Sequence, residues 1–410
     1  MELRIDSDVA DISVDEALFR CLCPYYAEVC ALSEIRKRPG FGIPLRSGMG
    51  GHSLLYLNGV RVDRSERYPK LVLCGADTLP ARHGVGISVN SHYRNANWVA
   101  AEGRQFIWRG ALEPGEGLTR SAYRRTQELA KAQGVLDGIE FHEHLFRDKP
   151  RGMSERDYMY EISIATDYAV RFGRRVYRAR VPLDRNRMEM MVNYLNDLNV
   201  PYRDGCRQFR WRVLNNNCSH VAHNALAKAG IWPHWPTGQV FGVALFKFPV
   251  PKNEFVDIVR RTNDLPIHDV RAIYDDELAR RALLETGALP TAPGALAIAE
   301  PVIRQNEIYE TERLRLIFYD NPFWGPYRRH FARILDEARY SNLQANLRHF
   351  ARIYETAQER RRSTRGNRAR SSPEEEFQLH YDRYIERDAL RVSGLLSSLD
   401  RTAESAARVT

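Results

Sequence analysis

No run of about 20 apolar residues, the length that a membrane-spanning helix needs, occurs in this 410-residue chain. One uncharged run, at about 286–299, is shorter and is interrupted by Pro290 and Pro293. The first residues, MELRIDSDVADISVDEAL, are acidic and lack the apolar centre of a secretory signal. We therefore expect a cytoplasmic protein without a transmembrane segment, although secretion without a cleaved signal is also compatible with the sequence.

Cysteine is scarce, and its spacing is irregular. The six cysteines are Cys21, Cys23, Cys30, Cys74, Cys206 and Cys218. They show neither the even spacing of a disulfide framework nor a CxxC pair, which favours a reducing compartment and gives little indication of a structural zinc site. His142 and His144 alternate as on a strand or loop and do not match the HExxH pattern of zinc enzymes. We expect no metal and no other cofactor.

Lysine is rare as well. Only seven of the 61 basic residues are lysines, so arginine carries most of the positive charge behind the net charge of +9. Codon usage in a GC-rich genome explains this bias simply, and a surface for nucleic acid, phospholipid or phosphate is the functional alternative. The densest run, RRRSTRGNRAR at 360–370, has six arginines and no acidic residue. It also lacks the aromatic residues on which single-stranded nucleic acid stacks, so we interpret 360–372 as an Arg-rich linker.

Strand and helix patterns divide the chain into three parts. We expect a helical and irregular segment at 1–44, a mixed α+β domain at 45–250 and a helical region at 251–410. The expected strands in the first half cover 52–57, 70–74, 85–90, 97–103, 105–110 and 174–183, and the expected helices cover 118–133, 153–173 and 184–199. A Pro-, Ala- and Gly-rich stretch at 287–301 is expected to be a boundary.

The segment VLNNNCSHVAHNALAKAGIW, residues 213–232, places a thiol at the predicted start of a helix. Asn is a preferred N-cap, so Asn216 or Asn217 can close the helix and leave Cys218 in its first turn. There the positive end of the helix favours the thiolate and lowers the pKa of the thiol. We therefore predict that Cys218 is a nucleophile; a buried structural cysteine is the alternative.

A nucleophilic cysteine needs a base, which is usually histidine. His220 and His223 follow Cys218 by two and five positions, so neither shares its face of the helix. His52 is the better candidate because it follows GMGG and opens the strand pattern HSLLYL. A flexible entry into a rigid element is suited to holding a catalytic side chain.

The stretches GHSLLYLNGV and NNCSHVAHNAL together resemble the circularly permuted papain-like superfamily of cysteine hydrolases and acyltransferases. In these proteins a histidine at the start of a strand precedes a catalytic cysteine at a helix N-terminus, as His52 precedes Cys218 here. The strand from His52 to Tyr56 and the run Asn217-Cys218-Ser219-His220 are similar to the motifs of NlpC-like and lecithin:retinol acyltransferase-like relatives. A bacterial family of unknown function is also similar, through the runs Val181-Pro182-Leu183, Asn193-Tyr194-Leu195, Phe209-Arg210-Trp211 and Asn216-Asn217-Cys218. The resemblance covers about 45–232 and requires an insertion near 111–170.

The resemblance implies an α+β fold, namely a permuted papain-like domain with an antiparallel sheet packed on helices, followed by an added helical region. It implies a thiol-dependent hydrolase of amidase or peptidase type, acting on an amide, ester or thioester, or a lipid acyltransferase of the same fold. The family's third polar residue, which orients the histidine, would be Asn90 or His92. The substrate-lining or oxyanion residues would be Asn217, His220, Trp98 and Ser53.

A non-catalytic role is the alternative from another class. In that case the Arg-rich run at 360–370 and the helical C-terminal region would bind an anionic membrane or nucleic acid. The peptide, protein or lipid substrate and the oligomeric state cannot be read from the sequence.

Overall fold

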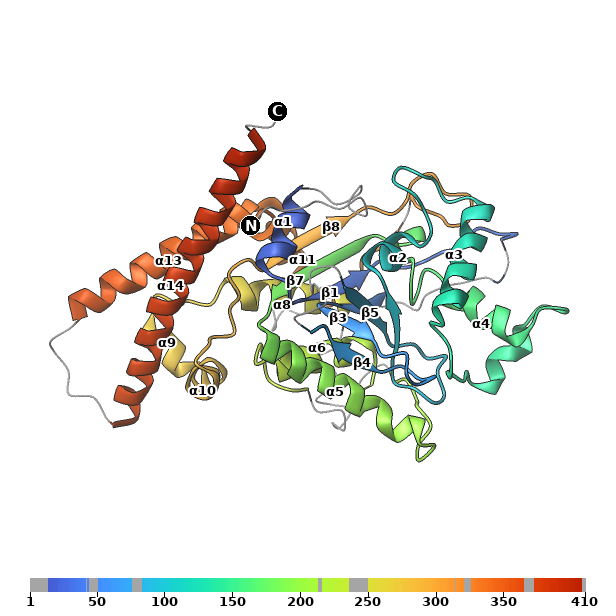
Figure 1. The fold of residues 1–410 in the computed structure, drawn as a ribbon, viewed down its shortest axis with the longest axis horizontal. Coiled ribbons are helices and arrows are strands. Elements are labelled where there is room, and N and C mark those ends of the chain that lie inside the picture. Colours follow the sequence, from blue (N-terminus) through green and yellow to red (C-terminus); the bar gives the residue numbers. More distant parts are fainter. Residues whose placement is uncertain are drawn as a thin grey trace.

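The computed structural model describes residues 14–41, 43, 51–75, 83–212, 216–235, 250–312, 314–320, 326–364 and 372–407. Within them the chain forms an α+β fold around a six-stranded antiparallel sheet (Figure 1). This confirms the expected class and the antiparallel sheet packed on helices.

The sheet has the strand order β6-β5-β2-β1-β7-β8. Its strands are β1 (Tyr26–Leu32), β2 (His52–Asn58), β5 (Gly84–Ser88), β6 (Val99–Glu102), β7 (Val176–Pro182) and β8 (Leu296–Glu300). Strand β1 lies in the middle and pairs over its full length with β2 on one side and β7 on the other. All residues of β1, β2 and β7 are buried, because helices cover both faces of the central strands. A separate hairpin joins β3 (Val60–Val62) to β4 (Leu71–Leu73).

Helices α6 and α8 position the site described below, because α6 (Cys218–Lys228) packs on β2 and α8 (Pro251–Asn263) packs on β1, β7 and α6. The other elements before residue 204 are α1 (Val14–Leu22), α2 (Arg104–Arg109), α3 (Arg120–Gln133), η3 (Glu143–Asp148), α4 (Glu155–Ser163), η4 (Val170–Phe172) and α5 (Arg185–Arg203). Helix α5 packs on α6 and on β4.

A second hydrophobic cluster lies in the C-terminal part, around Phe350, Tyr354, Tyr381 and Ile385. The helices there are α9 (Val270–Asp275), α10 (Glu277–Thr286), α11 (Tyr327–Asp336), α12 (Ala338–Ser341), α13 (Leu343–Thr364) and α14 (Ser372–Ala407). Helices α13 and α14 lie side by side at the end of the molecule opposite α3 and α4 (Figure 1). None of the described helices combines the length and the apolar character needed to span a bilayer.

Most of the Arg-rich linker, 365–371, lies outside the described residues. Of its described part, Arg361 pairs with Asp382 and Glu386 of α14, so its charge is used within the chain. Contact of 360–370 with an anionic surface stays a prediction. The first three residues of GMGG, 48–50, and residues 213–215 are also outside the described part.

Four expectations about secondary structure are wrong. Residues 26–32 form β1 rather than part of a helical segment. The sequence pattern did not indicate a buried strand there because it contains the charged Glu28. Residues 104–109 form α2 rather than a strand, since Gly103 and Gly110, both at positive φ, bracket one helical turn. The helix expected at 153–173 ends at Ser163. The resemblance implies an aromatic strand at the run Phe209-Arg210-Trp211, but residues 209–211 are not in a strand.

The boundary expected at 287–301 contains β8, which pairs with β7. Strands β1 and β8 both come from outside 45–250 and complete the sheet formed within it. Whether the three predicted parts are separate domains stays a prediction, and the same holds for an insertion near 111–170.

A buried ionic cluster ties the sheet to the helices on it. Glu28 of β1 is fully buried and accepts hydrogen bonds from Arg178 at 2.8 Å and Arg180 at 2.6 Å, both on β7. Arg104 of α2 lies 3.2 Å from the same carboxylate. A carboxylate can be buried at this depth only because several guanidinium groups replace its hydration.

Two further carboxylates balance the charge of this cluster. Glu16 lies 2.6 Å from Arg180, and Glu300 pairs with Arg178. Burial opposes ionisation, but the surrounding arginines lower the pKa of Glu16 to about 2 and hold the pKa of Glu28 well below its usual value. The folded chain therefore stabilises the ionised carboxylates of Glu16 and Glu28 relative to the unfolded chain.

Acid should weaken the fold through this cluster. A folded-state pKa below the unfolded value of 4.5 gives stability that is present above pH 4.5 and is lost as the pH falls through the folded values. We expect the melting temperature to fall steeply below pH 4.5, with a shallower fall in Glu16→Gln. A melting temperature that stays constant down to pH 3 would contradict this assignment.

Candidate active site

Cys218 is the first residue of α6 and is half-buried. Asn217 caps this helix, because its Oδ1 accepts a hydrogen bond from the His220 backbone N–H at 3.1 Å. The same oxygen lies 3.0 Å from His220 Nδ1, so the His220 ring takes part in the helix cap. The expected cap is confirmed at Asn217, and the thiol lies in the first helical turn.

The thiol of Cys218 lies against the beginning of β2. Its Sγ accepts a hydrogen bond from the Ser53 backbone N–H at 3.3 Å. His52 is the preceding residue, so Sγ lies within about 6 Å of the His52 Cα. Among the described residues no hydrogen bond joins the thiol to the His52 ring, and direct contact between the two side chains stays a prediction.

The expected low pKa of the thiol is wrong for this structure. Burial raises the pKa of Cys218 above its usual value. The backbone N–H groups of Ser53, Ser219 and Cys218 itself, together with the charge of Lys252, lower it without overcoming burial. A helix N-terminus favours a thiolate, but the loss of water around the sulfur is the larger effect here.

The ring of His52 is the first member of a buried polar chain. Its Nε2 lies 3.0 Å from the hydroxyl oxygen of Ser88, and that hydroxyl donates to Asp167 at 2.6 Å. Because the Ser88 proton points to Asp167, its oxygen accepts from His52, and the proton of the neutral ring is assigned to Nε2. The lone pair on Nδ1 is then available as a proton acceptor.

His52 is a weak base in this setting. Burial, together with the positive charges of Arg174 and Lys252 and the neighbouring His92, lowers its pKa to about 3. The ring is therefore neutral at physiological pH. Its role in the resting protein is that of a fixed neutral imidazole and not of an imidazolium paired with a thiolate.

Asn90 and His92, the two candidates for orienting His52, occupy different places. Asn90 donates to the Asp167 carboxylate at 3.4 and 3.5 Å and so helps to hold the carboxylate that ends the polar chain. The His92 ring packs on Phe141, with 5.6 Å between ring centroids. The residue that contacts the His52 ring is Ser88, which was not among the residues predicted to orient the histidine.

Asp167 and Arg174 belong to the site and were missed as well. Ala165 and Ala169, on either side of Asp167, adopt positive φ of 61° and 51°, which ends the helix and turns the carboxylate inward. Arg174 is buried and donates to the Ala165 carbonyl at 3.0 Å and the Ser33 carbonyl at 2.7 Å. It places a fixed positive charge near Cys218, Asp167 and His52.

Lys252 is a fourth residue of the site that the sequence analysis did not predict. It lies in the first turn of α8 and is fully buried. No sequence pattern around it indicates a site, and its only signal is the rarity of lysine in this chain.

The remaining predicted residues differ in how they are placed. Trp98 is fully buried, and its Nε1 donates to the Leu195 carbonyl at 2.6 Å. This is the setting of a core residue and gives no support to a substrate-lining role. Ser53 is buried beside the thiol, and within the described residues its hydroxyl has no hydrogen-bond partner.

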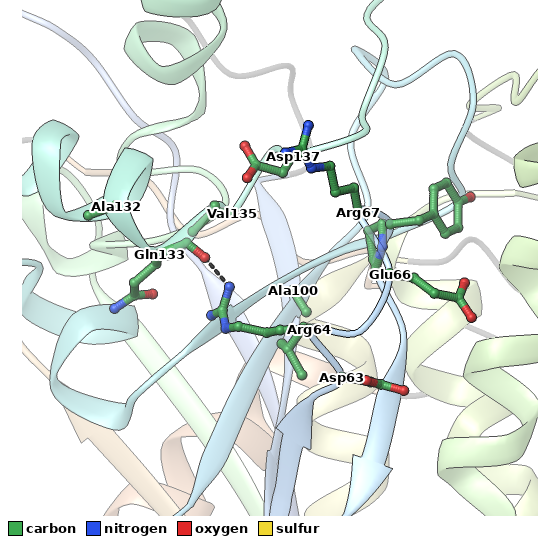
Figure 2. A pocket seen from close by; sticks show the side chains of 13 residues that line it. Asp63, Arg64, Glu66, Arg67, Ala100, Ala132, Gln133, Val135 and Asp137 are labelled. Carbon is green, nitrogen blue, oxygen red and sulfur yellow. Dashed lines mark hydrogen bonds between the residues drawn. The ribbon is translucent and has the colours of Figure 1, made fainter.

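A cavity of about 270 Å³ lies between the loop after β3 and the end of α3, away from these residues. Figure 2 shows Arg64 reaching across it to the Gln133 carbonyl, with Asp63, Glu66 and Asp137 around its rim. Arg64 also pairs with Glu102 at 2.8 Å. No residue of the Cys218 site lines this cavity.

Among the described ranges, no three His, Cys, Asp or Glu side chains gather as metal ligands would. His142 and His144 stack with ring centroids 5.7 Å apart, and His142 Nε2 bonds the Phe209 carbonyl at 3.1 Å. Comparison of the chain with protein-family models, curated proteins and solved structures gave no match.

Proposed function

We propose that this chain is a thiol-dependent hydrolase with a permuted papain-like domain, in which Cys218 attacks the carbonyl carbon of an amide, ester or thioester. The observation that carries the proposal is the contact of the Cys218 thiol, at the start of α6, with the Ser53 N–H beside His52. It brings Cys218 to the residue that follows His52, although 166 positions separate Cys218 from His52 in the sequence.

The proposed reaction has two steps. The Cys218 sulfur bonds to the acyl carbon, the thiol proton passes to the leaving group, and a thioester forms. Water then attacks the thioester, the acyl group leaves as an acid, and the thiol regains its proton. Transfer to another acceptor in place of water would make the same site an acyltransferase.

Two groups support the charges that develop. The backbone N–H groups of Ser53 and Cys218 lie at the thiol and can stabilise the negative charge on sulfur or on the carbonyl oxygen. The Nδ1 lone pair of His52, left available by the contact of Nε2 with Ser88, accepts the proton of the attacking water.

The experiment is a turnover screen of the full chain with peptide-amide, aryl-ester and acyl-thioester substrates that release a chromophore. We expect turnover in at least one class, with a loss of about 100-fold or more in His52→Gln, the usual contribution of a positioned base. Turnover unchanged in His52→Gln would contradict the proposed pair.

Ser88→Ala should lower the turnover rate by about tenfold or more, because it cuts the link between His52 and Asp167 and releases the ring. The measurement is the ratio of kcat to KM beside the melting temperature. Ser219→Ala is the matched control, because Ser219 is also buried beside Cys218 and, within the described part of the chain, its hydroxyl has no partner. Equal losses in both variants would show that Ser88 acts only through packing.

A further inference from the structure

Lys252 of α8 and Cys218 of α6 lie against the same short segment, residues 51–53. Lys252 lies at Gly51, and Cys218 lies at Ser53. Cys218 Sγ accepts the Ser53 N–H at 3.3 Å. Lys252 Nζ lies over Gly51, where a methyl group would overlap both that nitrogen and the Leu32 carbonyl. Gly51 has a φ of 75°, so a glycine here suits both the backbone and the close approach of the amine.

A buried clamp holds the two helices together. His223 of α6 is stacked between Trp232 and Trp235, with ring centroids 4.2 and 3.9 Å away. Its Nδ1 lies 3.0 Å from Glu254 of α8, two residues beyond Lys252, and its Nε2 lies 2.9 Å from the Pro233 carbonyl. These contacts fix α8, which carries Lys252, relative to α6, which carries Cys218.

The charged and titratable groups that face Lys252 come from several elements around it. The charged groups are Arg174 before β7 and Glu34 after β1, and the titratable groups are Cys218 of α6 and the His52 ring of β2, which is neutral. Burial, aided by Arg174, lowers the pKa of Lys252 to about 7, so a large part of the amine is neutral at physiological pH. His52, with a pKa of about 3, is the far weaker base.

We propose that Lys252 is the general base that takes the proton of Cys218 as the sulfur attacks. The inference rests on the proposed function and refines its first step, leaving His52 to act on water in the second step. The S–H bond of Cys218 breaks and an N–H bond forms on Nζ, so a thiol and an amine become a thiolate and an ammonium. The thiolate bonds to the acyl carbon, and the ammonium returns its proton to the leaving group.

The test is the rate of Cys218 alkylation by iodoacetamide against pH, read by peptide mass in the full chain. In the native chain the rate should rise with a midpoint near pH 7, the value for Lys252. In Lys252→Met the midpoint should move above the ordinary thiol value of 9.0, which at pH 7.5 slows alkylation about tenfold or more. His52→Gln should keep the native midpoint.

Two controls test whether Lys252 acts as a base. One distinguishes a base from a fixed positive charge, and the other from the effect of removing any lysine near Cys218. Lys252→Arg keeps a positive charge that does not dissociate near neutral pH, so it should lose the midpoint near 7 as Lys252→Met does. Lys228→Met removes an exposed lysine of α6 and should leave the profile unchanged. A native midpoint in Lys252→Met, or its loss in His52→Gln, would overturn the proposal.

If the Lys252 variants lose cooperative melting, the proposal is tested instead by titrating the native chain labelled with ¹³C-lysine. The chain has seven lysines, and we expect one of them to titrate near pH 7 and to shift after Cys218 alkylation. Seven lysines that all titrate above pH 9 would overturn the proposal. These measurements need no substrate: turnover through Cys218 with an unaltered Lys252→Met profile refutes the inference alone, and a Lys252-dependent profile without turnover refutes the proposed function alone.

Discussion

Cys218→Ala should abolish acyl turnover, with a loss of about 1,000-fold or more, while the melting temperature changes little. The sulfur is the only group of this residue that forms the covalent intermediate, and alanine cannot replace it. Alanine is the best helix former, and Asn217 still caps α6 through His220 N–H, so the helix should persist. The half-buried thiol contributes less packing than a core side chain.

The measurement compares turnover and thermal melting of Cys218→Ala with those of the native chain. Cys30→Ala is the matched control, because Cys30 is a fully buried cysteine of β1. It should lose about 1 kcal/mol or more of stability and keep its turnover. A Cys218→Ala protein that melts clearly lower and turns over as the native chain does would mean that the thiol is structural.

Glu28→Gln should destabilise the fold by about 3–5 kcal/mol, the usual cost of removing one partner from a buried ionic group. Glu28 accepts from Arg178 and Arg180 and lies beside Arg104, so the neutral amide leaves three guanidinium groups facing too little negative charge. The side chain hardly changes in size, so the loss is electrostatic and not a loss of packing.

The free energy of unfolding in urea at pH 7 is the quantity to measure. Glu113→Gln is the control, because Glu113 is exposed and lies outside the cluster, and it should change stability by less than about 0.5 kcal/mol. The two variants together show whether charge in the middle of the sheet stabilises this fold. Equal stabilities of Glu28→Gln and the native chain would refute the role given to the cluster.

The sequence predicted the parts of the fold that local patterns encode. The amphipathic segment at 118–133, the strand that begins at His52 and the cap at Asn217 all occur where they were expected. Strand β1 was missed because Glu28 is compensated by arginines from β7 and α2, which no local pattern connects to it. Long-range charge pairing overrides the local rule that a buried strand is apolar.

The candidate site was only partly predictable for a similar reason. His52 and Cys218 stand in recognisable motifs, but Asp167 lies in a segment whose pattern continues as a helix. The positive φ values of Ala165 and Ala169, which turn Asp167 inward, follow from tertiary packing and not from any turn signal. Lys252 comes to the segment beside the thiol only because α8 packs on α6 and β1.

The most direct test of the proposed thiol chemistry is to trap the acyl group on Cys218. The native chain and His52→Gln would be incubated with the substrate that turns over in the screen, quenched in acid and digested, and the mass of the Cys218 peptide measured. We predict an acyl thioester on Cys218, with more of it in His52→Gln because its hydrolysis by water is slowed. A Cys218 peptide that stays unmodified while substrate is consumed would contradict the proposal.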